Sequence, residues 1–171
     1  MINITVKLLF VLAAIKWGDW RGWKKYYPTI QFFIIGDLFY NLVFHDYPLW
    51  RFEEIIPLIK YDIFIMLSFM FLRYPATVFI YLGRFPKEKG KAIMWYLFWV
   101  LLYIGIETID LKIGLIKHYN SWNIWWSLVF DMLLFALLRI HLHRPLLAWG
   151  LAVLSSILLW NLLGVPFHIL K

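Results

Sequence analysis

The chain has 171 residues, 63% of them hydrophobic and 21% aromatic, and it carries a formal net charge of +7. Soluble domains are closer to half apolar, so this composition indicates a membrane protein. Cysteine is absent, which excludes disulfides, thiolate metal sites and thiol catalysis. The basic residues lie in short gaps between apolar runs, a placement that fits the positive-inside rule and disfavours a nucleic-acid-binding face.

The apolar runs predict an all-α fold: a polytopic transmembrane helical bundle of six spans, forming one integral membrane domain over residues 1–171. In chain order the six predicted helices are Ile2–Trp17, Pro28–Phe44, Leu58–Leu82, Ala92–Ile116, Asn123–Arg139 and Leu146–Leu170. The first is short for a span and contains Lys7 and Lys16. A helix lying in the membrane interface is therefore the alternative for this segment, and it would leave five spans.

The first connector, Gly18–Tyr27, mixes tryptophan and tyrosine rings with the cations Arg21, Lys24 and Lys25. Aromatic rings and cations together are typical of the lipid headgroup layer, so we expect a connector that lies on the membrane surface. Pro28 follows at once and suits the first turn of a helix, where its missing N–H costs nothing.

Polar residues interrupt the second and third predicted helices. Asp37 and Asn41 are four residues apart, so they share one helix face. The segment His45–Pro57, which contains two prolines, is predicted to be a loop. In the third helix, Pro75 removes one backbone hydrogen bond and is expected to kink the helix two residues after Arg73.

The fourth predicted helix poses the main physical problem of this chain. It opens with fifteen residues that carry no charge, and it then places Glu107 and Asp110 one helical turn apart. Carboxylates inside the hydrocarbon are costly unless a partner or water reaches them. After a short turn, the fifth helix carries Asn123, Ser127 and Asp131 at intervals of four residues, which predicts a polar stripe along one face.

The charges of the gaps predict the topology. Lysine and arginine are concentrated in alternate gaps, at residues 16–25, 84–91 and 139–144. These gaps are expected to be cytoplasmic, with both chain termini on the outside. The sixth helix is expected to break near Gly164 and Pro166.

Three stretches carry a resemblance to a known family: KYYPTIQFFIIGDLFYN (Lys25–Asn41), SWNIWWSLVFD (Ser121–Asp131) and LLRIHLHRPLLAW (Leu137–Trp149). They resemble an uncharacterised family of small multi-pass membrane proteins from spore-forming Firmicutes, and the resemblance covers most of the chain. It implies a protein of the bacterial cytoplasmic (cell) membrane. It implies no activity and brings no set of catalytic residues.

Helical rise brings the polar side chains to a few common depths. Measured from the cytoplasmic ends, Asp37, Arg73 and Asp131 fall near the midplane, and Glu107 and Asp110 fall nearer the outer surface. One arginine cannot balance four acids, so some of these acids must be protonated, hydrated or bound to a cation. The predicted intramembrane polar site comprises Asp37, Asn41, Arg73, Glu107, Asp110, Ser127 and Asp131.

This surplus of acids favours a transporter, channel or binder for a proton, a small cation or a cationic solute. The other expected partners are membrane lipids, and the sequence indicates no cofactor. Two alternatives remain open. One is a structural or scaffold membrane protein whose polar core only holds the helices together. The other is a membrane enzyme in which Glu107 or Asp131 acts as a general base on a lipid-borne substrate, although no nucleophile motif is present.

The five histidines all lie near predicted helix ends, and none is expected to sit with an acid inside a span. His141 and His143 are two residues apart and so do not share a helix face, which disfavours a metal site. Together with their neighbours they are expected to meet anionic lipid headgroups; this basic turn comprises Arg139, His141, His143 and Arg144.

Overall fold

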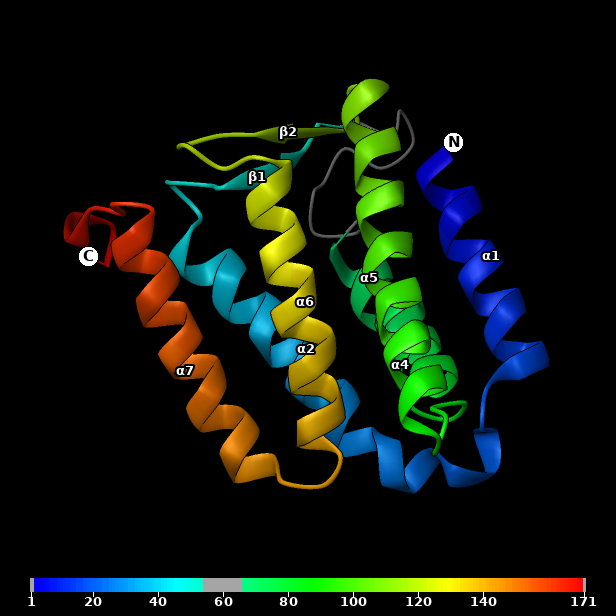
Figure 1. Cartoon of the computed structure of the whole chain (residues 1–171). Coiled ribbons are helices and arrows are strands. Elements are labelled where there is room, and N and C mark those ends of the chain that lie inside the picture. The colour runs from blue at the N-terminus through cyan, green and yellow to red at the C-terminus, as the bar shows by residue number, and fades with distance from the viewer. Residues whose placement is uncertain (1, 54–65, 171) are drawn as a thin grey trace. The chain divides into compact units, whose positions relative to one another are not determined.

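The computed structural model describes residues 2–53 and 66–170. The predicted start of the third helix, at 58–65, and the end of the loop before it lie outside the described residues. The described chain is mostly helical and contains one small two-stranded sheet (Figure 1). It divides into two compact units: unit 1 comprises Met1–Ile34 and Ile55–Trp95, and unit 2 comprises Ile35–Glu54 and Tyr96–Lys171. A single integral membrane domain stays a prediction.

Unit 1 is built around the contact of α1 with two consecutive helical segments. Its elements are α1 (Ile2–Trp17), the 3-10 turn η1 (Trp20–Gly22), the first half of α2 (Trp23–Val43), the π-helical turn η2 (Phe69–Arg73), α4 (Tyr74–Tyr81) and the start of α5 (Lys89–Lys112). Helix α1 lies beside η2 and α4. Small side chains are buried in this unit, among them Ala14, Ala76 and Val78. Side chains of this size let apolar helices approach closely.

The distortion predicted at Pro75 takes the form of a π-helical turn. The N–H of Tyr74 donates to the carbonyl of Phe69, five residues back, and not four as in an α-helix. Pro75 has no N–H and cannot bond to the carbonyl of Phe71, which weakens the α-helical pattern at this point. The wider turn directly before the proline is the structural consequence.

The first connector is more ordered than a surface loop. The Asp19 carboxylate accepts hydrogen bonds from the Gly22 N–H (3.2 Å) and from the Tyr26 hydroxyl (2.9 Å). These bonds cap η1 and fix the first turn of α2, which begins at Trp23. Pro28 therefore lies inside α2, and its predicted place in the first helical turn is wrong.

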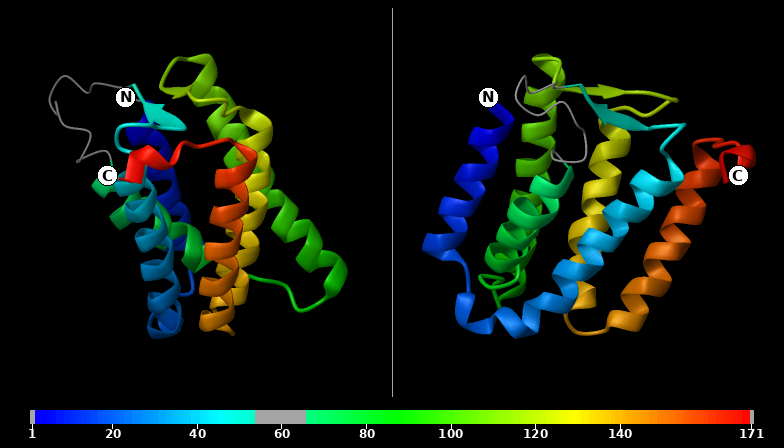
Figure 2. Two further views of the ribbon diagram at one scale, coloured as in Figure 1. Left: turned by 90° about the vertical axis from the view of Figure 1, so that its left-hand side faces the viewer. Right: turned by 180° about the vertical axis from the view of Figure 1, so that it is seen from behind.

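Unit 2 combines helices with the small sheet. Its elements are the end of α2, β1 (Trp50–Phe52), the rest of α5, β2 (Ile116–His118), α6 (Ile124–His141), α7 (Pro145–Leu162) and the 3-10 turn η3 (Phe167–Leu170). Helices α6 and α7 pack side by side (Figures 1 and 2). Strands β1 and β2 pair antiparallel, with Trp50 opposite His118. A purely helical fold is therefore wrong at these two strands, which fall in a predicted loop and at a predicted helix end and turn.

Tyr40 explains why β1 forms where the sequence predicts a loop. Its ring stacks on the ring of Trp50, with the centroids 3.9 Å apart. Its hydroxyl accepts hydrogen bonds from the N–H groups of Leu49 (3.1 Å) and Trp50 (3.0 Å) and donates to the Trp50 carbonyl (3.1 Å). A side chain on α2 thus satisfies the backbone groups of the incoming strand, which a local sequence pattern does not reveal.

The ends of the helices in unit 2 differ from the predicted ends in two places. Helix α5 stops at Lys112, and Gly114 follows with a positive φ of 75°, a conformation that favours glycine. Asn123 is not part of a polar stripe, because its side chain caps α6 by accepting the N–H groups of Trp125 and Trp126. The break predicted after the sixth helix is confirmed, since Gly164 has a φ of 62° just beyond α7.

Within the described residues, three helices are long and apolar enough to cross a membrane: α5, α6 and α7. Helix α7 has a single buried residue, Ala148, and leaves large side chains such as Leu146 (86% exposed) uncovered. An apolar helix that its own chain leaves largely exposed is suited to lipid. Two shorter apolar helices, Leu8–Trp17 and Met66–Tyr81, belong to unit 1. These features support a membrane protein, whereas the count of six spans stays a prediction.

Candidate functional site

Glu107, on α5, is the centre of a hydrogen-bonded cluster in unit 2. Its Oε1 atom lies 2.7 Å from Nε2 of His118 and 2.5 Å from the hydroxyl oxygen of Ser127. His118 comes from β2 and Ser127 from α6, so the cluster joins three elements. The side chains of Glu107 and His118 are only 20% and 14% exposed. A carboxylate and an imidazole at this distance form a charge-assisted hydrogen bond when a proton lies between them.

Trp122 completes this cluster on its buried side. The indole Nε1–H donates to the Ser127 hydroxyl oxygen over 2.8 Å, and both residues are buried. Ser127 therefore accepts from Trp122 and donates to Oε1 of Glu107. The other carboxylate oxygen, Oε2, receives no hydrogen bond from any residue in the described ranges 2–53 and 66–170. Glu107 thus has one oxygen engaged twice and one that can accept a proton.

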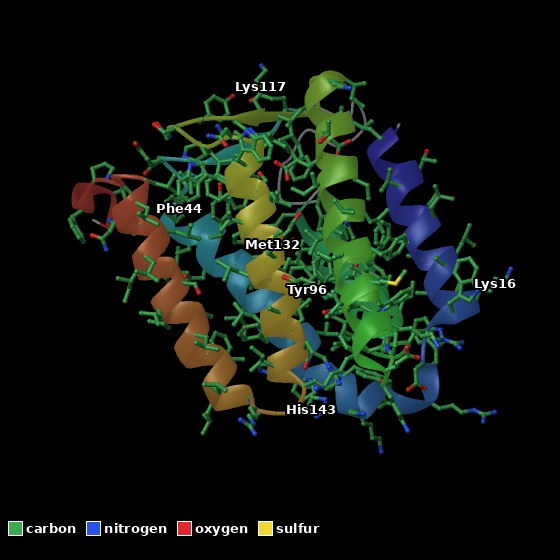
Figure 3. All side chains as sticks on the ribbon, viewed as in Figure 1. Lys16, Phe44, Tyr96, Lys117, Met132 and His143 are labelled. Atoms are coloured by element: carbon green, nitrogen blue, oxygen red, sulfur yellow. The ribbon has the colours of Figure 1, made fainter. Side chains whose placement is uncertain are left out.

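Contacts further along α5 and α6 show that the two helices run antiparallel past the cluster. The rings of Tyr103 and Phe135 meet edge to face, with centroids 5.0 Å apart. Nearer the start of α5, the Tyr96 hydroxyl donates over 2.8 Å to the carbonyl of Met132, which lies between Ser127 and Phe135 on α6; Tyr96 and Met132 are labelled in Figure 3. Together with the cluster, these contacts define one shared face of the two helices.

Two further acids of the predicted site are buried close to this cluster in the chain. Asp131 lies one turn beyond Ser127 on α6, and Asp110 lies one turn beyond Glu107 on α5. Each is 6% exposed. Buried carboxyl groups are costly unless they are protonated or bonded. Four predicted site residues thus belong to α5 and α6 of unit 2: Glu107, Asp110, Ser127 and Asp131.

The other predicted site residues lie on other elements. On α2, the Asn41 side-chain amide donates to the Asp37 carboxylate (3.2 Å) and to the Asp37 carbonyl (2.8 Å), which confirms that the two share a helix face. Asn41 is exposed. Arg73 is buried in unit 1, where its guanidinium lies over the rings of Phe10 (5.2 Å) and Phe69 (5.3 Å). Its role as a counter-charge for the acids of the site stays a prediction.

A second cluster ties β1 to β2. Glu53 accepts hydrogen bonds from the Tyr119 hydroxyl (2.5 Å) and from Nζ of Lys117 (3.2 Å), which is labelled in Figure 3. The hydrogen bond from Tyr119, and next that from Lys117, lowers the pKa of Glu53, while the same bond to Glu53 raises the pKa of Tyr119. Because Lys117 and Tyr119 flank His118 in sequence, this cluster holds the strand that presents the imidazole to Glu107.

The structure differs from the sequence analysis at two histidines. His118 lies on β2, beyond the end of α5, yet it bonds to Glu107 on that helix, a contact that the sequence does not predict. The sequence predicts His141 at the lipid headgroups, which is wrong, because His141 is buried at the end of α6. His143, labelled in Figure 3, is exposed and accepts a hydrogen bond from Arg139 (2.8 Å). The different burial of His141 and His143 agrees with the prediction that they do not share a helix face.

His118 is missing from the predicted site because it reaches Glu107 through a reversal of the chain. The two residues are eleven apart, a spacing that would not bring them together on one helix face. The reversal occurs at Gly114, where the Leu115 N–H bonds back to the Asp110 carbonyl over 2.8 Å. A glycine placed just past two acids, and followed by a histidine, is the sequence signal that indicates this arrangement.

No protein-family model, curated protein or solved structure matches this chain. The resemblance to a family of small membrane proteins from spore-forming bacteria therefore stays a prediction. In the part of the chain that the structure describes, no three His, Cys, Asp or Glu side chains are grouped to hold a metal ion. The Glu107–His118 pair instead has the two-atom geometry that suits a shared proton.

Proposed function

We propose that this chain is a small integral membrane protein that binds or passes a proton at the Glu107–His118 pair. The observation that carries the proposal is the 2.7 Å distance from His118 Nε2 to Oε1 of Glu107, a residue on a helix long and apolar enough to span a membrane. Ionised glutamate beside neutral histidine carries one negative charge, and uptake of one proton makes the pair neutral. In a medium of low dielectric constant this change has a large effect on the free energy of the site.

The neighbouring polar groups support movement of the proton beyond the pair. The Ser127 hydroxyl bonds to the same carboxylate, and Asp131 is buried one turn further along α6. Rows of acids and hydroxyl groups in apolar helices are typical of proton relays in membrane proteins. A small cation or a cationic solute is the alternative occupant of this same site, because buried carboxylates attract either.

The membrane topology belongs to the same proposal. Helices α5, α6 and α7 supply three spans, and we infer three more from α1, α2 and the helix that contains α4, with five in total if α1 lies in the interface. The positive-inside rule supports cytoplasmic basic connectors and external termini, and the predicted family resemblance supports a bacterial cytoplasmic membrane. In this topology the Glu107–His118 pair lies toward the outer surface.

Proton flux into proteoliposomes tests the proposal. The vesicles contain the purified protein and a pH-sensitive dye, and a potassium gradient with valinomycin sets the membrane potential. Glu107→Gln, which keeps the size of the side chain and cannot ionise, should lower the flux by about tenfold or more. The matched control is Asp46→Asn, because the Asp46 carboxylate is 93% exposed in a loop of the same unit. The control should keep wild-type flux.

The result that counts against the proposal is a folded Glu107→Gln protein with unchanged flux. Folding is checked by circular dichroism and gel filtration in the same detergent. His118→Gln and Asp131→Asn extend the series, and a relay requires that at least one of them reduces flux as well. Sodium or potassium flux that falls in place of proton flux would identify a cation as the occupant.

A structural role is the second candidate function, and one observation favours it. Trp122, Ser127, Glu107 and His118 form a continuous set of hydrogen bonds that joins α5, α6 and β2. A scaffold protein requires only that this set hold the elements together, so its wild-type vesicles would be no leakier to protons than empty ones. The enzyme alternative gains no such observation, because the Ser127 hydroxyl donates to Glu107 and not to the imidazole.

A further inference from the structure

A basic and aromatic face covers one end of unit 1. Four helix ends meet there, since α1 and α4 end and α2 and α5 begin at this end (Figures 1 and 2). The two connectors between these helices are held together by hydrogen bonds. Nε of Arg84 donates to the Trp17 carbonyl over 2.9 Å, across 67 residues of sequence, and the Asp19 N–H donates to the Phe79 carbonyl over 3.3 Å. Two basic segments that are far apart in the sequence thus form one surface.

This face carries nearly all of the net charge of the protein. The end of α1 and the first connector contribute four exposed cations, Lys16, Arg21, Lys24 and Lys25. The segment between α4 and α5, together with the start of α5, contributes four more, Arg84, Lys87, Lys89 and Lys91. Two anions oppose them: Asp19, which is engaged by Gly22 and Tyr26, and Glu88, which pairs with Lys91 over 2.7 Å. Eight positive and two negative charges leave a net +6 on this face, against +7 for the whole chain.

Aromatic rings alternate with these cations on the first connector. The exposed rings, each about half exposed, are Trp17 (50%), Trp20 (48%), Trp23 (48%) and Tyr27 (50%). The ammonium group of Lys16 lies over the Trp17 ring at 5.1 Å, and that of Lys24 lies near the Trp23 ring at 6.0 Å. Rings with an apolar body and a polar edge favour the membrane–water interface, where they anchor adjacent helices.

We propose that this face binds the headgroups of anionic phospholipids and enriches them around the protein over zwitterionic lipids. The charge sets the sign of the ligand, and the exposed indole rings distinguish a lipid surface from nucleic acid or an acidic protein. Cations gathered at one level act together on a negative leaflet, and salt weakens their attraction over a screening length of about 10 Å. The proposal is independent of proton binding, because Glu107 and His118 belong to unit 2.

Lipid selectivity measured by electron paramagnetic resonance tests this inference. The full-length protein is reconstituted in phosphatidylcholine bilayers with a trace of spin-labelled phosphatidylglycerol or spin-labelled phosphatidylcholine. The fraction of motionally restricted label gives the relative association constant of each lipid. We expect phosphatidylglycerol to associate about twofold or more better at low salt, and this preference to fall toward one in roughly 0.5 M salt.

The variants compare equal changes of charge on two units. The triple change Lys24→Gln, Lys25→Gln and Lys87→Gln alters the proposed face. The three replaced lysine side chains make no hydrogen bond to the described residues. The matched control is Arg51→Gln, Lys112→Gln and Lys117→Gln, three exposed cations of unit 2. The first triple should at least halve the preference for phosphatidylglycerol, and the second should change it little.

Three results would overturn the inference. One is a wild-type selectivity ratio of one at low salt, a measurement that needs no variant to fold. Another is an equal loss of selectivity in both triples, which would assign the preference to net charge and not to this face. The third is a labelled oligonucleotide that binds wild type in phosphatidylcholine nanodiscs and loses binding in the first triple, while the lipid preference stays unchanged.

Discussion

Replacement of Ser127 by alanine tests whether the Glu107 cluster holds unit 2 together. The hydroxyl accepts from the Trp122 indole over 2.8 Å and donates to Glu107 over 2.5 Å, so Ser127→Ala removes two hydrogen bonds at once. Ser127 is 4% exposed and Trp122 is 6% exposed, so water does not readily replace the lost oxygen. The truncated site leaves a buried indole N–H without an acceptor.

The magnitude follows from these two losses. A buried donor left without a partner costs roughly 1–3 kcal/mol, while hydrogen bonds between membrane helices average about 0.6 kcal/mol. We expect Ser127→Ala to lower the free energy of unfolding by about 2 kcal/mol. For a chain of this length that corresponds to a decrease of about 4–8 °C in Tm.

Reversible unfolding in mixed detergent micelles, followed by far-UV circular dichroism, measures this change. Ser156→Ala is the matched control, because that hydroxyl is exposed on α7 and bonds only to its own helix, at the Ala152 carbonyl. Its cost should be within about 0.5 kcal/mol. A double-mutant cycle with Trp122→Phe should show coupling of about 1 kcal/mol, since each change removes the same bond. Equal midpoints for Ser127→Ala and Ser156→Ala, or strict additivity in the cycle, would refute the reasoning.

The remaining predictions concern the cluster of Glu53 and Tyr119 that joins β1 to β2, and Gly83 in unit 1. The pKa of Glu53 is lowered from 4.5 in the folded chain, so the bonds that lower it add stability above pH 4.5, and this stability is lost as the pH falls. Glu53→Gln should therefore flatten the acid limb of a plot of unfolding midpoint against pH, and an unchanged limb would contradict the assignment. The pKa of Tyr119 is raised from 10.0, so its contribution is present below pH 10 and is lost above it; Tyr119→Phe should remove this alkaline decline from the same plot. A Cβ at Gly83 would lie 2.3 Å from the Phe79 carbonyl oxygen, so Gly83→Ala should destabilise the protein by about 1–3 kcal/mol. A Cβ at Gly90 would lie 4.0 Å from the Glu88 carboxylate, an ordinary contact, so Gly90→Ala should not lower the unfolding midpoint.

Helix positions were largely predictable because apolar runs and charged gaps are local features. The fifth and sixth predicted helices, Asn123–Arg139 and Leu146–Leu170, correspond to α6 (Ile124–His141) and α7 with its predicted break. Helical spacing also placed Ser127 and Asp131 on one face, and both are buried on α6. Each of these predictions depends on residues within a few turns of one another.

The parts that were not predicted depend on contacts between distant residues. Strand β1 forms because it pairs with β2 and because the Tyr40 hydroxyl binds its backbone. The Glu53–Tyr119 hydrogen bond joins residues that are 66 positions apart. The hydrophobic pattern within a single segment cannot reveal a contact of this kind. The early start of α2 has a similar cause, since the Asp19 side chain caps η1 and bonds to Tyr26 in the first turn of α2, which then continues through Pro28. Side-chain partners, and not propensity, decided these boundaries.

The contact of His118 with Glu107 changes the interpretation of the predicted intramembrane acids. From the sequence, four acids face one arginine, and that imbalance alone favours a bound cation. In the structure, Glu107 has an imidazole at 2.7 Å, so a proton on that imidazole supplies the missing positive charge from within the chain. In the proposed function, this same proton is the one that a membrane favours, because an uncompensated charge is costly in low dielectric. The proposed function therefore gives one group of atoms two roles, stabilising the fold and exchanging a proton, and flux measured on Glu107→Gln separates these two roles.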